Sequence, residues 1–330
     1  MIERYSYSYE SLEINEGFIS YKKYAPVVSK ATVIMVHGFP DYSYTWRHQI
    51  LPIVSNGFTV ITPDLPGFGS SQFDASVLSN FGLKFTTTCF VKIMDHEKVE
   101  KAVFIGHDWG GAVIWSMYLF HPERVQALAS LCTAFSPTKT KFIPLDDLVK
   151  LIPQFKYQLY FADKKLGARE ELLQNVERFF KLMFIRSDSK AQVKFFSNKK
   201  QMLPDYNIDI KASDLIVSED ELEEYVKTFK KTTFDAPLNW YATREINWRD
   251  ETEKLSGNKQ RVVVPSLMIT AGKDKVLTRE MSLGMDKYFD KLSRHHVEEA
   301  GHWCHVEQKE EVNRVIVDWL NTLNSTRSKL

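Results

Sequence analysis

The stretch AVFIGHDWGGA, residues 102–112, joins two apolar runs through one short polar turn. Its first four residues have the length and composition of a buried strand, and residues 112–120 continue as an apolar helical segment. Asp108 therefore lies in a sharp turn between a strand and a helix. Comparable turns carry a serine nucleophile at the centre of GxSxG, but the chain contains no GxSxG motif. Asp108 stands in the place of that serine.

An aspartate at this turn admits two interpretations. A carboxylate is already an anion at neutral pH, and the N-terminus of the following helix favours the charged form. Asp108 could therefore attack a saturated carbon and form an alkyl ester. The structural alternative is that Asp108 only caps its own helix, since aspartate is among the preferred N-cap residues.

A second strand end supports the catalytic interpretation. Residues 33–36 form an apolar run that leads directly into HGFP, residues 37–40. A loop at this position can supply a backbone N–H to an oxyanion hole. We therefore expect the N–H of Phe39 to be one oxyanion donor and the N–H of Trp109 to be the other.

Two more candidate groups follow strands near the C-terminus. Asp274 comes just past the apolar run of residues 262–271, and His302 follows a short stretch at residues 296–298. Functional groups in open α/β sheets collect at the carboxyl ends of the strands. Asp108, Asp274 and His302 should therefore meet as nucleophile, acid and histidine, in the chain order that such folds use.

These motifs resemble those of epoxide hydrolases with the α/β-hydrolase fold, including the hydrolase domain of the vertebrate soluble enzymes. The resemblance extends from about Glu13 to Leu320, although Pro66 stands where many relatives have arginine. It implies a mostly parallel central sheet with helices on both faces and an inserted helical cap. The segments that carry it are VIMVHGFPDYSYTWR, TPDLPGFGSS, VFIGHDWGGAVIW, YQLYF, APLNWY and AGHWCHVEQ.

The resemblance also implies a mechanism. Tyr157 in YQLYF and Tyr241 in NWY match the two cap tyrosines that polarise the epoxide oxygen. Tyr160 is the alternative to Tyr157, because it lies three residues away. Asp108 would form an ester, and His302, oriented by Asp274, would activate the water that hydrolyses it to a vicinal diol.

The sequence also indicates the lining of the pocket. Phe39, Trp109 and Trp303 are expected to line a pocket for a small apolar epoxide, with no cofactor or metal. His302 and His305 form an HxxH pair, but the spacing lacks an acidic third ligand.

Two other functions share parts of this pattern. A haloalkane dehalogenase uses the same aspartate and ester, and GHDWGG occurs in that family too, but it commonly places an asparagine where this chain has Phe39. A fluoroacetate dehalogenase would carry arginine at the position of Trp109. A hydrolase-fold receptor or interaction module would be expected to have lost part of the triad, and no member is missing here.

The order of apolar runs predicts one core with an insertion. Residues 1–135 and 251–330 should form the α/β-hydrolase core, and residues 136–250, which show helical periodicity, should form the cap. A hairpin is expected at residues 10–25 around Asn15-Glu16-Gly17. Core strands are expected at about residues 33–36, 58–62, 102–106, 127–132 and 262–270.

Composition narrows the partners and the compartment. The 330 residues carry 43 basic and 42 acidic side chains, a net charge of +1 that gives no support to a nucleic-acid partner. Cys89, Cys132 and Cys304 are odd in number and widely spaced, which suggests reduced thiols. The N-terminus lacks the apolar run of a signal peptide, and no run approaches a membrane span.

The last three residues form a targeting motif. Ser328-Lys329-Leu330 is the SKL signal that the peroxisomal import receptor binds at a C-terminus. The polar tail NSTRSKL should be exposed, as a receptor requires. The sequence therefore predicts a peroxisomal protein, with the cytoplasm as the alternative location.

Overall fold

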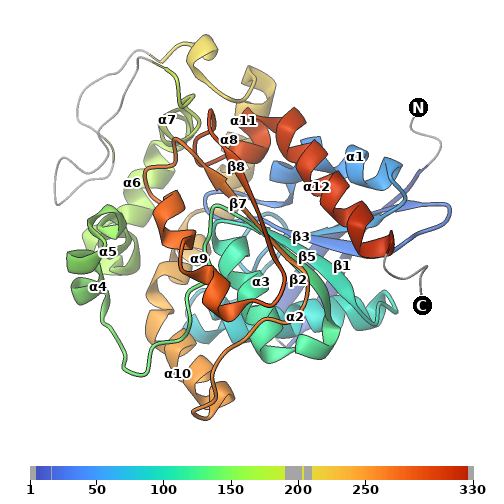
Figure 1. Cartoon of the computed structure of the whole chain (residues 1–330). Helices are drawn as coiled ribbons and strands as arrows, with labels where there is room; N and C mark the ends of the chain where they lie inside the picture. The colour runs from blue at the N-terminus through green and yellow to red at the C-terminus, as the bar shows by residue number, and fades with distance from the viewer. Residues whose placement is uncertain (1–4, 16, 190–202, 204–209, 326–330) are drawn as a thin grey trace.

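A computed structural model describes residues 5–15, 17–189, 203 and 210–325 (Figure 1). Its centre is an eight-stranded sheet in the order β1-β2-β4-β3-β5-β6-β7-β8. The strands are β1 (Tyr5–Ile14), β2 (Gly17–Pro26), β3 (Thr32–Val36), β4 (Thr59–Pro63), β5 (Ala102–His107), β6 (Val125–Leu131), β7 (Ser266–Ala271) and β8 (Leu292–Val297).

Strand β2 runs opposite to both of its neighbours in the sheet. β1 and β2 form the antiparallel hairpin expected from Asn15-Glu16-Gly17, and β2 pairs antiparallel with β4. Every pair from β4 to β8 is parallel. The parallel strands therefore end at a common edge, where the loops after β3, β5, β7 and β8 meet.

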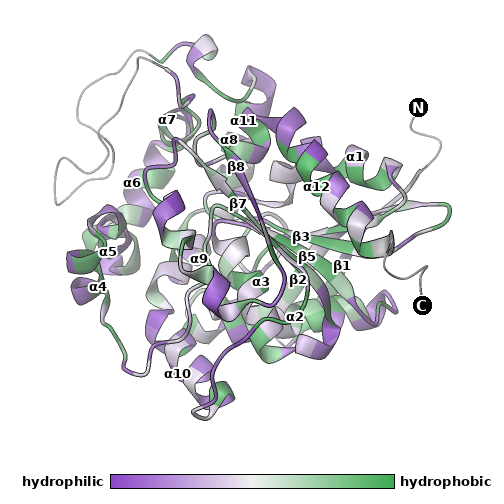
Figure 2. Cartoon of the chain, in the orientation of Figure 1, coloured by the Kyte–Doolittle hydropathy of each residue, from purple (hydrophilic) through white to green (hydrophobic). Residues whose placement is uncertain are grey.

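The parallel strands β3 to β7 are largely buried on both faces. Successive side chains of a strand point to opposite sides, so each strand contributes to two cores. Ile34 and Val36 belong to one core, with helices α2 (Leu83–His96) and α3 (Trp109–Phe120). Val33 and Met35 belong to the other, with helices α1 (Arg47–Ser55) and α12 (Lys309–Ser325). Figure 2 shows green along the central strands, whereas the edge strand β8 is purple.

A helical insertion occupies the chain between β6 and β7, and Figure 1 shows its first helices beside the sheet. Apolar residues on facing helices hold it together, as where α7 and α8 pack through Phe180 and Phe229. Its helices are α4 (Leu145–Leu151), α5 (Tyr157–Ala162), α6 (Ala168–Gln174), α7 (Val176–Met183), α8 (Glu219–Thr232), α9 (Asp235–Asn239), the 3-10 turn η8 (Trp240–Ala242) and α10 (Arg244–Leu255).

Two expected boundaries differ from the structure. The apolar run that begins at Val262 was expected to be strand throughout, but β7 starts only at Ser266, directly after Pro265. Val262 makes a single isolated bridge to Phe289 instead. β8 is longer than the short stretch expected at residues 296–298, and its side chains are mostly polar because it is an edge strand.

Within the described residues, no helix combines the length and the apolar character that crossing a bilayer requires. All three cysteines are buried free thiols, as the sequence suggested.

Candidate active site

Asp108 occupies a strained turn between β5 and α3. Its backbone angles, φ 53° and ψ −120°, lie in a region that non-glycine residues rarely adopt. Such a conformation costs of the order of 1–3 kcal/mol and persists where the surrounding structure enforces it, often at functional sites. The side chain makes no capping hydrogen bond to α3. The absence of a side-chain cap hydrogen bond favours the catalytic interpretation of Asp108 over helix capping.

Two glycines allow the loops to close around this aspartate. A β-carbon on Gly38 would lie 2.4 Å from the β-carbon and from Oδ1 of Asp108. A β-carbon on Gly110 would lie 2.0 Å from the carbonyl oxygen of Val36. A larger residue at Gly38 or Gly110 would separate the loop after β3 from the start of α3. The backbone N–H donors would then move away from the Asp108 carboxylate.

The Asp108 carboxylate lies between backbone donors and an imidazole. The N–H of Phe39 donates to Oδ1 over 2.8 Å, and the N–H of Trp109 also donates to the carboxylate. Oδ2 lies 3.6 Å from Nε2 of His302. Burial raises the pKa of Asp108, although the charge of His302 and the two N–H donors oppose that effect.

His302 is held by the loop that follows β7. Its Nδ1 lies 2.7 Å from Oδ2 of Asp274. The other oxygen of Asp274 accepts the backbone N–H groups of Val276 and Leu277, each over 2.9 Å. Burial raises the pKa of Asp274, but His302 and the two backbone donors lower it more, so the carboxylate is ionised at neutral pH. An ionised Asp274 orders the N–H of His302 onto Nδ1 and leaves Nε2 to face Asp108.

Two carboxylates control the protonation of His302. Burial alone would lower the pKa of its imidazole, but the charge and hydrogen bond of Asp274, with the charge of Asp108, raise it to about 9. Neutralising Asp108 would remove one of these negative charges. The pKa of His302 would then fall, and the imidazole would become a competent base at neutral pH.

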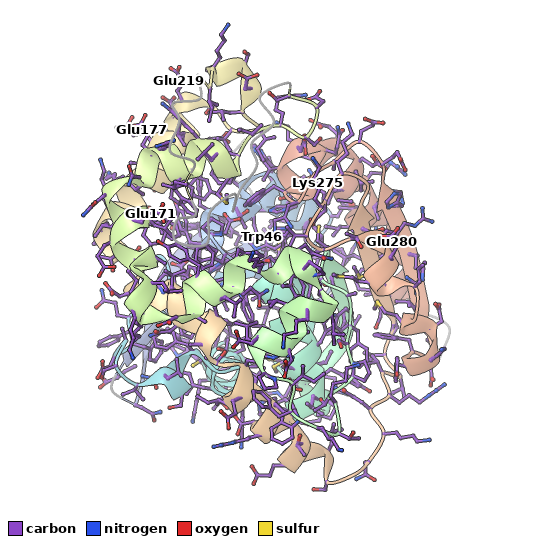
Figure 3. The ribbon with its side chains drawn as sticks, turned by 90° about the vertical axis from the view of Figure 1, so that its left-hand side faces the viewer. Trp46, Glu171, Glu177, Glu219, Lys275 and Glu280 are labelled. Atoms are coloured by element: carbon purple, nitrogen blue, oxygen red, sulfur yellow. The ribbon has the colours of Figure 1, made fainter. Side chains whose placement is uncertain are left out.

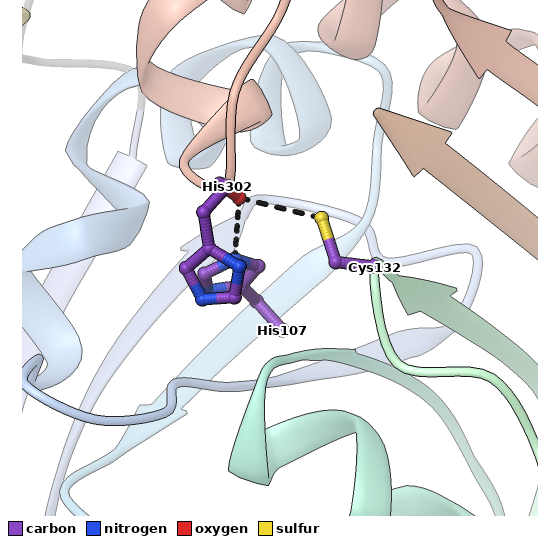
Figure 4. Close-up of side chains that lie close together, drawn as sticks. All are labelled: His107, Cys132 and His302. Carbon is purple, nitrogen blue, oxygen red and sulfur yellow. Dashed lines mark hydrogen bonds between the residues drawn. The ribbon is translucent and has the colours of Figure 1, made fainter. Parts of the chain in front are cut away.

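The backbone of the site is fixed from behind by residues that the sequence did not single out for this task. Nε2 of His107 donates to the carbonyl of His302 over 2.8 Å, and Sγ of Cys132 donates to the same oxygen over 3.3 Å (Figure 4). The hydroxyl of Thr133 donates to the carbonyl of Asp108 over 2.6 Å. Side-chain nitrogen and sulfur atoms of His107, Cys132 and His302 are also close enough to hold a metal ion.

The two expected tyrosines lie together on the insertion side of Asp108. The rings of Tyr157 and Tyr241 are 5.9 Å apart, and their side chains are hydrogen-bonded. Tyr241 also packs edge-to-face on Phe39 and on Trp109, at 5.4 Å in each case. Burial and then the charge of Asp108 raise the pKa of Tyr157, and burial, Tyr157 and Asp108 raise that of Tyr241. Both phenols therefore stay protonated at neutral pH beside the carboxylate.

Tyr160 is directed elsewhere. Its hydroxyl donates to Glu171 over 2.8 Å, within the insertion. The structure therefore places Tyr157, and not Tyr160, beside Tyr241 and Asp108.

Trp303 is the third expected pocket residue, and a buried carboxylate holds it. Its indole ring lies edge-to-face on His302 at 4.9 Å, and its Nε1–H donates to Oδ2 of Asp41 over 2.8 Å. The hydroxyl of Tyr225 donates to Oδ1 of Asp41 over 2.7 Å. Burial raises the pKa of Asp41 to about 6. The sequence analysis missed Asp41 because its partners lie far away along the chain.

An open groove of about 1170 Å³ reaches Tyr241 from the insertion. It is lined by residues around α4, α5 and α10. Its lining contains three basic and three acidic side chains, namely Lys150, Lys156, Arg244, Asp146, Asp163 and Glu245. The groove thus offers no excess of either charge to an approaching molecule.

Known proteins share this architecture and sequence. Residues 31–309 match the alpha/beta hydrolase fold family. Bifunctional epoxide hydrolase 2 of Rattus norvegicus is 36% identical over 94% of this chain and 56% of its own length. The chain thus spans little more than half of that relative. Epoxide hydrolase srdG of Neurospora crassa is 31% identical over 88% of this chain and 86% of its own.

A solved structure gives the same result. The crystal structure of epoxide hydrolase A from Mycobacterium thermoresistibile superposes with a TM-score of 0.81 at 29% identity, covering 96% of this chain and 98% of that one. The expected fold, a mostly parallel sheet with helices on both faces, is confirmed. The chain belongs to the alpha/beta hydrolase fold family and, within it, to the epoxide hydrolases.

Proposed function

We propose that this chain hydrolyses epoxides to vicinal diols through a covalent ester on Asp108. One observation carries the proposal. A buried carboxylate, bound by backbone donors at one oxygen and facing His302 with the other, lies opposite two protonated phenols. That arrangement supplies a nucleophile, a base and an acid to one small space. The names of the relatives support the same reaction.

Ring opening is the first proposed step. The oxygen of Asp108 that faces His302 attacks an epoxide carbon, and the bond from that carbon to the ring oxygen breaks. The ring oxygen leaves with the electron pair but stays on the substrate, so it is a poor leaving group that needs a proton. Tyr157 and Tyr241 donate to it, and the proton of one phenol neutralises the alkoxide. The product is a hydroxyalkyl ester of Asp108.

Ester hydrolysis is the second step. His302, oriented by Asp274, takes a proton from water, and the hydroxide attacks the carboxyl carbon of Asp108. The N–H groups of Phe39 and Trp109 stabilise the oxyanion, a contribution of roughly 10²–10³-fold for each donor. The tetrahedral intermediate collapses, and the diol oxygen leaves with the proton that His302 had accepted. Asp108 is released as the carboxylic acid, and its proton returns to the tyrosinate left by ring opening, which regenerates both groups. No metal or cofactor takes part in either step.

Dehalogenation is the competing function. A halide leaves as an anion and needs N–H donors but no acid. The two phenols beside Asp108 favour an oxygen leaving group, and the loop after β3 has Phe39 where many dehalogenases carry an asparagine donor. We therefore place the chain with enzymes that open epoxides.

The insertion, at about residues 136–250, would act as the cap over this site. It contributes both tyrosines, although α10 continues to Leu255 and so crosses the proposed boundary. The balanced charge of the groove beside Tyr241 suits an uncharged, largely apolar epoxide, such as one formed on an aromatic or fatty chain. Phe39, Trp109 and Trp303 would form the apolar wall beside Asp108.

Turnover in the presence of a chelator tests this proposal. Purified protein with no added metal should hydrate members of a panel of aryl, aliphatic and fatty-acid epoxides. The Asp108→Asn variant should be inactive on the same panel. Halide release from bromoalkanes without epoxide hydration would assign the chain to the dehalogenases instead.

The location is a separate proposal. Ser328-Lys329-Leu330 lies outside the described residues, so its support is the sequence alone. A fluorescent protein fused to the N-terminus should enter peroxisomes through the import receptor, and deletion of the three residues should leave it in the cytosol. Identical cytosolic patterns for both forms would make the motif a coincidence.

A further inference from the structure

A second cluster of polar side chains lies in the interior, on the far side of His107 from the carbonyl of His302. It consists of Asp41, His107 and His305, all fully or almost fully buried. One ligand atom of each lies within 4.8 Å of the others. The rings of His107 and His305 are 4.5 Å apart, and His305 also packs on Trp46, whose position in the interior Figure 3 shows.

Hydrogen bonds engage one nitrogen, Nε2, of each imidazole. Nε2 of His107 faces a carbonyl oxygen, that of His302, so it must carry the hydrogen. Nε2 of His305 faces the hydroxyl of Thr45 over 2.8 Å. In His107 the lone pair is therefore on Nδ1, and in His305 it is on Nδ1 in the tautomer whose Nε2–H donates to the hydroxyl of Thr45.

These two Nδ1 atoms have no hydrogen-bond partner within the described part of the chain. The cluster presents two unpartnered imidazole nitrogens beside a buried carboxylate. Asp41 already accepts hydrogen bonds from Tyr225 and Trp303, whereas a cation can bind both nitrogens and the carboxylate together.

We propose that Asp41, His107 and His305 form a binding site for one divalent cation of the zinc type. Two imidazoles and one carboxylate are a common ligand set for Zn²⁺, and imidazole ligands disfavour Mg²⁺ and Ca²⁺. Bond lengths of about 2.0–2.2 Å would place tetrahedral ligand atoms roughly 3.3 Å apart, so side-chain shifts of about 1 Å complete the site. The carboxylate ligand comes from the loop after β3, and of the HxxH pair only His305 takes part.

The outer contacts match those of a metal site. Ligating histidines usually donate their second N–H to a carbonyl or other oxygen, as His107 does, and ligating carboxylates are themselves hydrogen-bonded. Tyr225 and Trp303 hold Asp41 in this way. The ion would stand behind the carbonyl of His302 and would not touch the reacting atoms, so the inference is independent of the proposed hydrolysis.

Metal binding to the intact chain tests the inference. Protein treated with a chelator and then dialysed should bind one Co²⁺ per chain on prolonged incubation, with visible bands of the intensity typical of four-coordinate cobalt. Zn²⁺ should displace those bands and raise the thermal midpoint of the wild type. Absence of stoichiometric binding would overturn the proposal and leave a water molecule or a proton as the occupant.

Four variants locate the ion. His305→Gln and Asp41→Asn should each weaken Zn²⁺ binding by more than about 100-fold, since each removes a direct ligand. His121→Gln, a control at a half-buried histidine outside the cluster, should bind as the wild type does. Cys132→Ser should also keep its affinity. Loss of binding in Cys132→Ser with retention in His305→Gln would place the ion on His107, Cys132 and His302 and contradict the proposal.

If His305→Gln does not fold, Asp41→Asn and the two control variants decide the question. An unchanged affinity in Asp41→Asn would exclude the proposed ligand set.

Discussion

The core and the helical insertion hold their site residues in different ways. In the core, hydrogen bonds to backbone atoms fix Asp108 and His302, through Phe39, Thr133 and His107. In the insertion, ring contacts hold the tyrosines, since Tyr241 packs edge-to-face on Phe39, Trp109 and Phe161. The hydrogen bonds fix the orientation and the charge of Asp108 and His302. Ring packing fixes only the position of the tyrosine side chains, which neighbouring rings can adjust.

The difference assigns the two chemical steps to two regions. Ester hydrolysis depends on charge and orientation inside the core, and ring opening depends on how the insertion presents its phenols to Asp108. Changes in the core should therefore separate the two steps, whereas changes in the insertion should slow the first step alone.

The largest effect is expected from Asp274→Asn. An asparagine amide can place a donor against Nδ1 of His302 and so favour the tautomer with hydrogen on Nε2, which cannot act as a base. Hydrolysis of the ester should slow by about 10⁴-fold, while alkylation of Asp108 changes little. Rapid-mixing kinetics measures the two rate constants. The control Asp286→Asn alters an exposed carboxylate bound to Arg294 and should behave as the wild type.

Loss of one tyrosine hydroxyl should have a smaller effect on the other step. Tyr157→Phe and Tyr241→Phe should each slow alkylation by about 10²-fold, and the double variant by about 10⁴-fold, because two donors share one oxygen. Tyr160→Phe is the matched control, since its hydroxyl binds Glu171. A damaging effect of Tyr160→Phe with an active Tyr157→Phe would reverse the assignment.

The two steps should also differ in their dependence on pH. Hydrolysis needs neutral His302. The pKa of His302 is about 9 while Asp108 is ionised, and this pKa falls once ester formation removes the charge of Asp108. In the ester, the pKa of His302 should therefore be lower than 9. At pH values below that pKa, the hydrolysis rate constant should decline about tenfold per pH unit. Alkylation needs ionised Asp108 and protonated phenols, so it should be retained where His302 is protonated and should decline only as Asp108 itself gains a proton. Equal profiles for the two steps would contradict this division.

The smallest effect is expected from Thr133→Val. Removal of the hydroxyl leaves the carbonyl of Asp108 without this donor and should cost about 1–3 kcal/mol of unfolding free energy. Turnover should fall by about tenfold or less, since the carboxylate itself keeps its donors. Denaturant unfolding measures the first quantity. Thr88→Val, whose exposed hydroxyl binds only its own helix, is the control.

The parallel sheet could be predicted from sequence because its strands are short apolar runs. β8 was largely missed because Arg294, His295 and His296 give an edge strand no such run. The predicted start of β7 was too early, because composition alone does not show that the strand begins only after Pro265.

Some residues of the site could be predicted from the sequence pattern, and others could not. Asp108, Asp274 and His302 each follow a strand, so topology alone brings them together. Tyr157 and Tyr241 could be chosen among 14 tyrosines only through the resemblance to epoxide hydrolases.

Supporting contacts were beyond such reasoning. Asp41 accepts hydrogen bonds from Tyr225 and Trp303, which lie 184 and 262 positions away in the sequence. No local sequence pattern predicts contacts over such separations. The left-handed backbone of Cys132, with φ 66°, has no sequence signal either. Their effect on the site appears only once the chain is folded.

The covalent ester on Asp108 is the central claim, and one measurement tests it most directly. In a single turnover in ¹⁸O water with enzyme in excess, water attacks the carboxyl carbon, so the label should remain on Asp108 and little should enter the first diol. With His302→Gln, intact-protein mass spectrometry should show enzyme plus substrate accumulating. Label appearing directly in the first diol, with no adduct in His302→Gln, would mean that water attacks the epoxide itself and would contradict the covalent mechanism.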